Sequence, residues 1–334
     1  MGKKILLAGD SPRYKANLHC HTNLSDGKFS PEAVKAAYLA HGYSVVAFTD
    51  HDVFLQHPEL CDAQFTALNG YEMEVNAPTD ERGFHKTCHM CLIARTPDMV
   101  TPVCWHRSKY LFAHATEQRD RVKNDPDAPD YERVYSASGI SDMMRRGRDA
   151  GFFVTYNHPT WSCERYPDYT GYHGMHAMEI VNYSCYYSGF AEENQRVYDD
   201  LLIDGKERIF CVATDDNHGE RDCFGGYTVI FAPSLAYTDI TDALFAGNFY
   251  ASTGAEITGM VLEDGQLTIT MPGAREVQLL VEHCDARHVF APSEEQPLTK
   301  VTVSVPARAA YFRVVVTDFS GRRAYTNAYF QDAL

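Results

Sequence analysis

Short runs of apolar, β-branched and aromatic residues recur through the first two thirds of the chain. They lack the strict apolar–polar alternation of a strand that has one face in water. Runs of this kind predict strands that are buried on both faces, as in a parallel sheet. The runs are VVAFTD (45–50), MCLIA (90–94), FFVTYN (152–157), AMEIVN (177–182), IFCVATD (209–215) and YTVIF (227–231).

Helical stretches separate several of these runs. Ser30 and Pro31 have the residue types preferred at the N-cap and the first position of a helix, and this helix is expected to stop before Gly42. Residues 138–151 and 189–205 predict two further helices that lead into strands. Alternating strands and helices predict an α/β fold with a parallel sheet, and roughly seven such units favour a closed barrel over an open sheet.

Two regions depart from this alternation. Residues 105–136 are charged and lack clear periodicity, which predicts an insertion or a lid. After residue 255 the chain has short alternating strands separated by Gly, Pro and Asp, a pattern typical of a small antiparallel β-sandwich. We therefore expect a barrel domain over 1–254 and an all-β accessory domain over 255–334. The expected strands of the second domain are QLTITM (266–271), EVQLLVEH (276–283), TKVTVSV (299–305), AYFRVVVTD (310–318) and AYTNAYF (324–330).

The composition is that of a folded protein whose partner is not a nucleic acid. Of the 334 residues, 45% are hydrophobic and 12% are aromatic, which argues against a disordered chain. The net charge of −15 disfavours a nucleic-acid partner, but a small anionic substrate fits if bound metal ions add positive charge. The opening MGKKILLAGD has too short an apolar run for a signal peptide, and no later stretch approaches the ~18 apolar residues of a membrane span. The ten cysteines are scattered singly, which favours free thiols and a cytoplasmic location.

Side chains of the types that bind metals follow the ends of the predicted strands. In NLHCHTNLSDG, His19 and His21 are two residues apart on an extended chain, so their side chains point the same way, and Asp26 lies in the turn that follows. The C-terminal ends of parallel barrel strands meet on one rim, where we expect these groups to gather. His89, at the start of its strand, fits this rule least well. The other candidates are His51, Glu72, His89, His158, Asp216 and His218.

These nine groups exceed the three or four protein ligands of a single zinc ion and suit two or three bridged divalent ions. The motifs HCH…SDG, TDH, GYE, CHM, NHP and DNH occur in this order over residues 14–225, and the set resembles the polymerase and histidinol phosphatase (PHP) family. The resemblance implies a distorted (β/α)7 barrel that holds up to three ions, often zinc, manganese or iron. The stretch FYASTGAEI followed by a β module is similar to the PHP subgroup with a C-terminal sandwich. The ligands implied are His19, His21, Asp26, His51, Glu72, His89, His158, Asp216 and His218.

Two positions leave alternatives open. The stretch GFHKTCHMC contains both His85 and His89, and His89 is preferred because it directly precedes the apolar run. In TDDNH an aspartate, Asp215, stands where the family usually has serine, and Asp216 is assigned as the ligand by counting back from His218.

Many PHP proteins are phosphoesterases, so the resemblance implies hydrolysis of a phosphate ester by a hydroxide that bridges two ions. Asp216, His218 and His158 are the expected catalytic residues. Asp50 and Asp215 are expected to orient ligand imidazoles through their second nitrogens. The cationic residues expected near a phosphate are Lys28, Arg82, Lys86, Arg165 and Arg221, and the tyrosines expected to line the pocket are Tyr183, Tyr186 and Tyr187.

Two other functions fit the same residues. Bridged ions polarise a carbonyl group as readily as a phosphoryl group, so the enzyme would equally hydrolyse a carboxylic ester or amide. Alternatively the barrel is a non-catalytic metal-binding scaffold and the sandwich binds a partner. The intact set of ligand-type residues argues against this loss of catalysis. The sequence indicates neither the substrate nor the oligomeric state.

Overall fold

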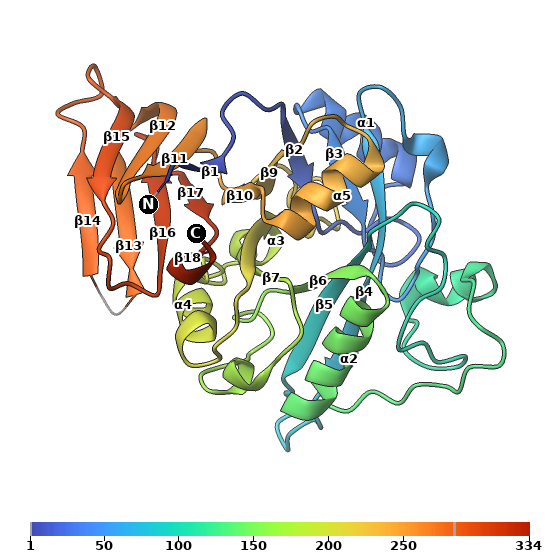
Figure 1. Cartoon of the computed structure of the whole chain (residues 1–334). Coiled ribbons are helices and arrows are strands. Elements are labelled where there is room, and N and C mark those ends of the chain that lie inside the picture. Colours follow the sequence, from blue (N-terminus) through green and yellow to red (C-terminus); the bar gives the residue numbers. More distant parts are fainter. Residues whose placement is uncertain (1, 283–284) are drawn as a thin grey trace.

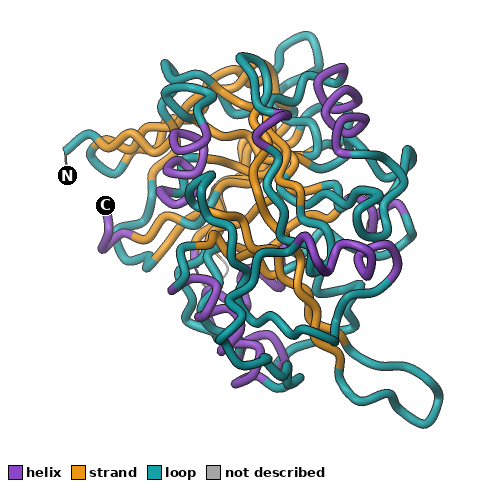
Figure 2. The backbone as a smooth tube through the Cα atoms, turned by 90° about the vertical axis from the view of Figure 1, so that its right-hand side faces the viewer, coloured by secondary structure: helices purple, strands orange, loops and turns teal. Residues whose placement is uncertain are grey.

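The computed structural model describes residues 2–282 and 285–334 (Figure 1). It combines a mixed α/β part, which contains most of the helices, with an all-β part formed mainly by residues 259–334. Figure 2 shows the strands in the interior, with helices and loops around them. No helix in the described part of the chain is long and apolar enough to cross a membrane.

One long sheet organises the α/β part. Along its hydrogen bonds the strands of this part follow the order β10-β9-β2-β3-β4-β5-β6-β7-β8. All six apolar runs of the first two thirds lie on these strands. Their bounds are β2 (Arg13–Asn17), β3 (Val45–Phe48), β4 (Thr66–Asn76), β5 (Thr87–Ala94), β6 (Phe152–Tyr156), β7 (Ala177–Asn182), β8 (Phe210–Thr214), β9 (Tyr227–Phe231) and β10 (Phe249–Ser252).

The sheet differs from the expected barrel in two respects. It is not closed, since no strand ladder joins β8 to β9 or β2 among the described residues. It is also not fully parallel, because β5 runs antiparallel to both β4 and β6. The physical reason is the connection between β4 and β5, which is a hairpin rather than a crossover helix. This hairpin projects from the body of the molecule in Figures 1 and 2.

The three predicted helices are present, together with α3 and α5, which the sequence pattern did not predict. Ser30 caps the first helix, because its hydroxyl accepts a hydrogen bond from the Ala33 amide at 3.3 Å, as its residue type indicated. The helices are α1 (Pro31–Ala40), α2 (Ala137–Asp149), α3 (Tyr183–Tyr187), α4 (Gln195–Ile203) and α5 (Tyr237–Ala246). Short 3₁₀ turns are η1 (Pro58–Leu60), η2 (Ala113–Arg121), η3 (Asp168–Gly171) and η5 (Gln331–Ala333).

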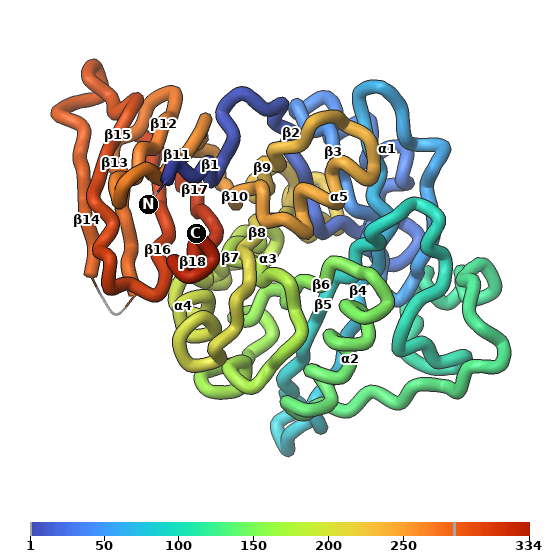
Figure 3. Tube along the Cα trace, in the orientation of Figure 1, coloured from blue at the N-terminus to red at the C-terminus, as the bar shows by residue number. Residues whose placement is uncertain are grey.

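The all-β part has two antiparallel layers that share one hydrophobic core. One layer is the sheet β1-β11-β12-β15, and the other is the β14-β13-β16-β17 end of the long sheet. Figure 3 shows the N-terminal strand β1 beside β11, although the two come from opposite ends of the chain. The division into domains 1–254 and 255–334 stays a prediction. The strands are β1 (Lys4–Leu7), β11 (Gly259–Glu263), β12 (Gln266–Ala274), β13 (Glu276–Val281), β14 (Asp285–Phe290), β15 (Leu298–Ser304), β16 (Tyr311–Thr317), β17 (Arg323–Thr326) and β18 (Tyr329–Phe330).

The two parts are joined through backbone hydrogen bonds. Strand β10 pairs with β9 on one side and with β17 on the other, so that Tyr250 lies opposite Thr326 and Ser252 lies opposite Ala324. The Asn327 side chain adds two hydrogen bonds to backbone carbonyl groups near β10, at 3.0 and 3.1 Å. The predicted strand 276–283 corresponds to β13, and its last residue, His283, lies outside the described residues. The nine cysteines of the described chain are free thiols.

Candidate metal centre

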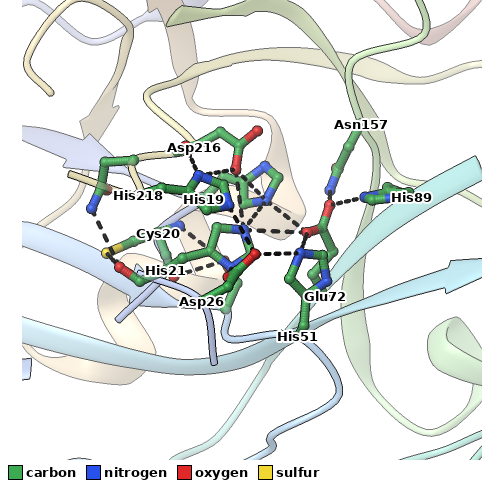
Figure 4. Close-up of polar contacts among 12 residues, drawn as sticks. His19, Cys20, His21, Asp26, His51, Glu72, His89, Asn157, Asp216 and His218 are labelled. Atoms are coloured by element: carbon green, nitrogen blue, oxygen red, sulfur yellow. Dashed lines mark hydrogen bonds and ion pairs between the residues drawn. The ribbon is translucent and has the colours of Figure 1, made fainter. Parts of the chain in front are cut away.

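His19 and His21 lie just beyond the end of β2, on either side of Cys20. Cys20 makes a bridge to Asn217, which holds this stretch extended, and its side chain packs into the core near α1. Both imidazoles therefore turn to the opposite side, with their Nε2 atoms 3.1 Å apart (Figure 4). This is the convergence that the spacing of the two histidines predicted.

Five imidazoles surround the carboxylate of Glu72, which lies in the hairpin strand β4 and is 1% exposed. A carboxylate at this depth is costly unless positive charge or hydrogen-bond donors neutralise it. Glu72 Oε2 lies 3.2 Å from His19 Nε2, 3.3 Å from His21 Nε2 and 3.4 Å from His51 Nε2, and its Oε1 lies 3.2 Å from His89 Nδ1 and 3.4 Å from His158 Nε2.

Asp216 and Asp26 complete the cluster on the other side. Asp216 Oδ1 lies 3.1 Å from His21 Nε2 and 3.2 Å from His19 Nε2. Asp26 Oδ2 lies 3.4 Å from His218 Nε2. All nine residues expected as ligands take part in four overlapping groups whose ligand-type atoms lie within 4.8 Å of one another. The structure therefore brings together the whole set that the strand-end pattern singled out.

The direction of β5 explains why His89 joins this set although it lies near the start of its strand. Because β5 is antiparallel to β4 and β6, its beginning lies at the same edge as the end of β6. His158, which follows β6, is 4.9 Å from His89 between ring centroids. The rule that ligands follow strand ends therefore holds for parallel strands only.

His158 and Asp216 have an unusual backbone conformation. Their φ angles are 24° and 54°, in the left-handed region that residues other than glycine rarely adopt. Such conformations persist only where the surroundings impose them, and they concentrate at functional sites. Both residues direct side chains into the cluster.

The positions of the side chains distinguish His89 from His85 and Asp216 from Asp215. His85 is exposed near the tip of the β4–β5 hairpin, whereas His89 is buried in the cluster. Asp215 accepts hydrogen bonds from the Tyr38 hydroxyl at 2.8 Å and from the backbone amides of residues 224–226 at 2.8–2.9 Å. Asp215 thus holds the loop after β8 in place, while Asp216 faces the imidazoles.

Asp50 and Asp215 do not orient imidazoles as predicted. Asp50 accepts hydrogen bonds from the amide and hydroxyl of Thr22, at 2.7 and 2.8 Å, and from the Ser25 hydroxyl at 2.7 Å. It therefore fixes the turn that carries Asp26. The reason for the error is that each carboxylate adjoins a ligand in sequence but points away from it, toward the backbone of a neighbouring loop.

Glu179, on β7, makes the contact that was expected of these aspartates. Its Oε1 lies 2.7 Å from His19 Nδ1, and its Oε2 accepts a hydrogen bond from the His158 amide at 2.9 Å. The carboxylate is fully buried and also accepts from the Thr214 hydroxyl at 2.6 Å. The signal in the sequence was a lone charged residue inside the apolar run AMEIVN. Asn157, which donates to Glu72 Oε1 at 2.7 Å, was likewise missed.

The charges of the cluster compensate one another in the protein alone. Burial opposes a charged imidazole, but the carboxylates, Asp216 first among them, outweigh it and raise the pKa of His19 well above the usual value. The same balance raises the pKa of His89 to about 10. His51 differs, because burial dominates and lowers its pKa to about 3. The raised pKa values of His19 and His89 favour their charged forms beside the carboxylates.

The polar atoms of the cluster fit divalent metal ions. His51 Nδ1 is buried and lacks a hydrogen-bond partner among the described residues. His21 Nδ1 and Asp216 Oδ1 are buried without a well-formed hydrogen bond, although they lie 3.4 Å from Asp26 Oδ1 and 3.1 Å from His21 Nε2. Unpaired buried polar atoms are rare in folded proteins and call for an explanation such as an ion. Imidazole nitrogens together with carboxylate oxygens are a donor set for zinc, manganese or iron.

A cavity of about 300 Å³ opens above the cluster. Seven of the nine ligand-type residues line it, together with Glu74. The rest of its wall is formed by Phe112, Trp161, Ser184, Cys185 and Ser188.

The segment 105–136 forms part of the cavity wall. The Phe112 ring lies 4.8 Å from the His51 ring between centroids. Further along the segment, the buried guanidinium of Arg133 makes a bidentate ion pair with Asp52, the residue directly after His51. The segment is therefore attached to the same loop that carries one of the candidate ligands.

The cationic residues expected near a phosphate and the tyrosines expected in the pocket do not line the cavity. Among the described residues that surround it there is no Lys or Arg. Arg82 pairs with Asp80, and the Lys86 ammonium lies 2.5 Å from Asp168, while Lys28, Arg165 and Arg221 are exposed. Helix α3 does reach the cavity, through Ser184, Cys185 and Ser188 rather than through the predicted Tyr183, Tyr186 and Tyr187. Proximity in sequence to a ligand motif did not predict which way these side chains point.

Several solved structures are similar to this chain, each at low identity. One is a two-domain protein from Bacteroides vulgatus that contains a predicted PHP-like metal-dependent phosphoesterase, with 16% identity, a TM-score of 0.46 and coverage of 97% of this chain and 96% of that chain. A candidate metal-dependent phosphoesterase from Bifidobacterium adolescentis has 15% identity, a TM-score of 0.35 and coverage of 64% and 90%. An amidohydrolase from Chromobacterium violaceum, with bound sulfate and no metal, has 16% identity, a TM-score of 0.35 and coverage of 61% and 87%.

No curated protein matches the chain. The match to a protein family is confined to the part that contains most of the cluster, from the HCH motif to the NHP motif. It confirms the family that the ordered motifs indicated. Residues 17–158 of this chain are a PHP domain.

Proposed function

We propose that this protein is a metal-dependent hydrolase and that the bond it cleaves is a phosphoric ester. The observation that carries the proposal is the packing of nine ligand-type side chains, Glu72 and Asp216 among them, into four overlapping groups beside an open cavity. Divalent ions bound there would satisfy these desolvated nitrogen and oxygen atoms together.

We assign the ions to the overlapping groups of the cluster. One group contains His21, Asp26, His51 and His218, and another contains His51, Glu72 and His89. The remaining groups are His19, His21 and Glu72, and His19, His158 and Asp216. Two or three divalent ions, of zinc, manganese or iron, account for this set. Bound there, they would act as Lewis acids that make water nucleophilic near neutral pH and stabilise charge on the phosphoryl oxygens.

One contribution of the protein is to orient three of the imidazoles through their Nδ1 atoms. His19 Nδ1 faces Glu179, and His158 Nδ1 lies 3.2 Å from the Ser162 hydroxyl. His218 Nδ1 lies 2.9 Å from the Asp216 carbonyl oxygen. Each of these Nδ1 atoms has a partner other than the ligand-type side chains, which leaves Nε2 directed inward as a ligand atom.

We place Asp216, His218 and His158 in contact with the reacting atoms, because all three line the cavity. Of the two imidazoles in this set, His218 is the more solvent-accessible, with a side chain that is 33% exposed. This position suits a group that orients the water or moves a proton at the mouth of the cavity.

The decisive experiment combines metal content with a substrate panel. Elemental analysis of purified protein is expected to give two or three metal ions per chain, with fewer in the double variant His19→Ala/His21→Ala. His85→Ala is the matched control, because His85 is an exposed histidine outside the cluster. The panel compares a phosphomonoester, a phosphodiester and a carboxylic ester. Absence of metal even after reconstitution, or full activity of the double variant, would contradict the proposal.

Hydrolysis of a carboxylic ester or amide at the same site is the second candidate. It is favoured by the lack of Lys and Arg among the described residues around the cavity, because a carbonyl substrate needs no cationic clamp. Turnover of the carboxylic ester alone in the panel would select it.

A further inference from the structure

We propose that the substrate is a phosphate monoester with a single anionic group, esterified to a planar, uncharged group that Phe112 and Trp161 bind. This inference rests on the proposed function and concerns the part of the substrate that the metal ions do not hold. It follows from the charges and the apolar surface of the cavity wall.

The charge of the wall excludes a second anionic group on the substrate. Apart from the imidazoles, the ionisable groups that line the cavity are the carboxylates Asp26, Glu72, Glu74 and Asp216 and the buried thiol of Cys185. The nearest buried guanidinium, Arg133, is already paired with Asp52. Phosphate recognition away from a metal normally uses Arg, Lys or a cluster of backbone amides. A second phosphate or a carboxylate on the substrate would therefore find no Lys or Arg among the described residues that line the cavity, and Glu74 adds a further carboxylate to its wall.

The apolar part of the wall consists of two aromatic rings beside the candidate ligands. The Trp161 indole is nearly perpendicular to the ring of His158, at 5.0 Å between centroids, and to the ring of His89, at 5.4 Å. The Phe112 ring is tilted by 50° to the ring of His51, at 4.8 Å between centroids. Both rings thus lie next to the position where a scissile phosphate would bind, within reach of the group attached to it.

The protein holds Trp161 in place although its side chain is partly exposed. The Trp161 amide donates to Glu192 Oε2 at 2.9 Å, and the Thr160 amide donates to Glu192 Oε1 at 3.3 Å. Glu192 is fully buried. Trp161 itself remains 39% exposed at the cavity. A fixed, half-exposed aromatic ring is a preorganised surface for stacking a planar group.

Phe112 is held from the other side of the cavity. The residue lies just before η2, where the His114 amide donates to the Ser25 carbonyl at 3.0 Å. Ala115 of the same turn packs with Val53 and Leu55, which follow His51. Two independent segments of the chain therefore bring one aromatic ring each to the same cavity.

Non-hydrolysable phosphonates test this inference directly. Isothermal titration of the zinc-loaded protein would compare phenylphosphonate, methylphosphonate and 3-phosphonopropionate. We expect phenylphosphonate to bind about tenfold more tightly than methylphosphonate, because it buries one ring against the two aromatic side chains. The second anionic group of 3-phosphonopropionate is expected to give no gain over methylphosphonate.

Two alanine variants test whether the aromatic rings cause the preference for the phenyl group. Phe112→Ala and Trp161→Ala are each expected to remove most of the preference for the phenyl group and to leave metal content unchanged. Phe290→Ala is the matched control, since Phe290 is an exposed aromatic residue on β14, in the all-β part. The chain has two tryptophans, so a Trp105→Phe background makes Trp161 the only indole whose fluorescence reports ring contact.

Equal affinity for the phenyl and methyl compounds would overturn the inference while leaving phosphate binding, and so the proposed function, intact. Tighter binding of 3-phosphonopropionate would overturn it in the same way. If the zinc-loaded protein binds none of the phosphonates, the proposed phosphoesterase function fails and this inference fails with it.

Discussion

Glu72 and Glu164 are both buried glutamates, with exposures of 1% and 5%, but their surroundings are opposite in kind. Glu72 lies among imidazoles. Glu164 lies among hydroxyl groups and accepts hydrogen bonds from Tyr156 and Tyr172 at 2.5 Å each, and from Tyr135 at 2.9 Å. Each group is enclosed by the fold, and only the chemistry of its neighbours differs.

The difference determines the charge of each carboxyl group. Burial alone raises the pKa of a carboxyl group, and this effect prevails at Glu164 over the hydrogen bonds from the tyrosines. At Glu72 the imidazoles of His19, His89 and His51 overcome burial and hold the pKa well below its usual value. Burial of an acid is therefore not evidence of a metal site by itself. Burial among nitrogen donors is.

Removal of the charge at Glu72 is expected to have the largest effect. Removing one partner from a buried set of charged groups costs about 3–5 kcal/mol. A cost of this size in metal binding corresponds to a roughly thousandfold lower affinity. Glu72→Gln should therefore lose bound metal and with it nearly all hydrolytic activity. Glu164→Gln serves as the matched control and should retain both. Metal analysis and steady-state kinetics check this, and normal metal content in Glu72→Gln would show that the cluster does not depend on the central charge.

Truncation at Glu164 should affect folding instead. Glu164→Ala would leave the buried hydroxyls of Tyr156 and Tyr172 without their acceptor, at a cost of about 3 kcal/mol in the free energy of unfolding. Metal content per folded chain should not change. Urea denaturation followed by circular dichroism measures the loss. A loss of metal without a loss of stability would mean that the tyrosine cluster belongs to the site.

A smaller effect is expected at Glu179, which supports a ligand from outside the cluster. Glu179→Gln should weaken metal binding by between about 10- and 100-fold, because the partner of a ligand imidazole sets its tautomer and basicity. Glu192→Gln is the control, since Glu192 is equally buried and accepts from backbone amides of the Trp161 loop. Competition with a chelator measures the affinity for metal. Equal affinities for the two variants would show that Glu179 does not support His19 as a metal ligand.

The smallest effect is a change in pH dependence at Glu164. Because its pKa is raised in the folded state, the folded protein binds a proton there over a pH range in which the unfolded chain has released it. In that range the stability of the wild type falls as pH rises. Glu164→Gln removes this contribution, so its stability relative to the wild type should increase from pH 4 to pH 7. The opposite trend in urea midpoints would show that the carboxylate is preferred in the folded state.

The sequence was most informative where a local pattern determines geometry. The i, i+2 spacing of His19 and His21 was enough to predict that they converge, and Ser30 was enough to locate the start of α1. These inferences need only the geometry of one extended segment and the first turn of one helix. The order of the motifs then identified the family correctly.

The sequence was least informative where partners come from distant strands. Nothing local indicates that β5 reverses direction, or that the sheet stays open between β8 and β9. For the same reason the roles expected of Asp50 and Asp215 were wrong and that of Glu179 was missed. Glu179 contacts His19 across 160 positions of the chain, a pairing that only the folded sheet creates.

The ladder that joins β10 to β17 has a consequence for how the molecule unfolds. Strand β10 is hydrogen-bonded on one edge to the sheet that carries the metal centre and on the other edge to the all-β part. Separation of the two parts would expose unpaired backbone groups along both strands, which is strongly unfavourable. Thermal denaturation should therefore proceed as one cooperative transition in calorimetry. A ligand bound at the metal centre would then protect the distant strands from hydrogen exchange as well as those beside it.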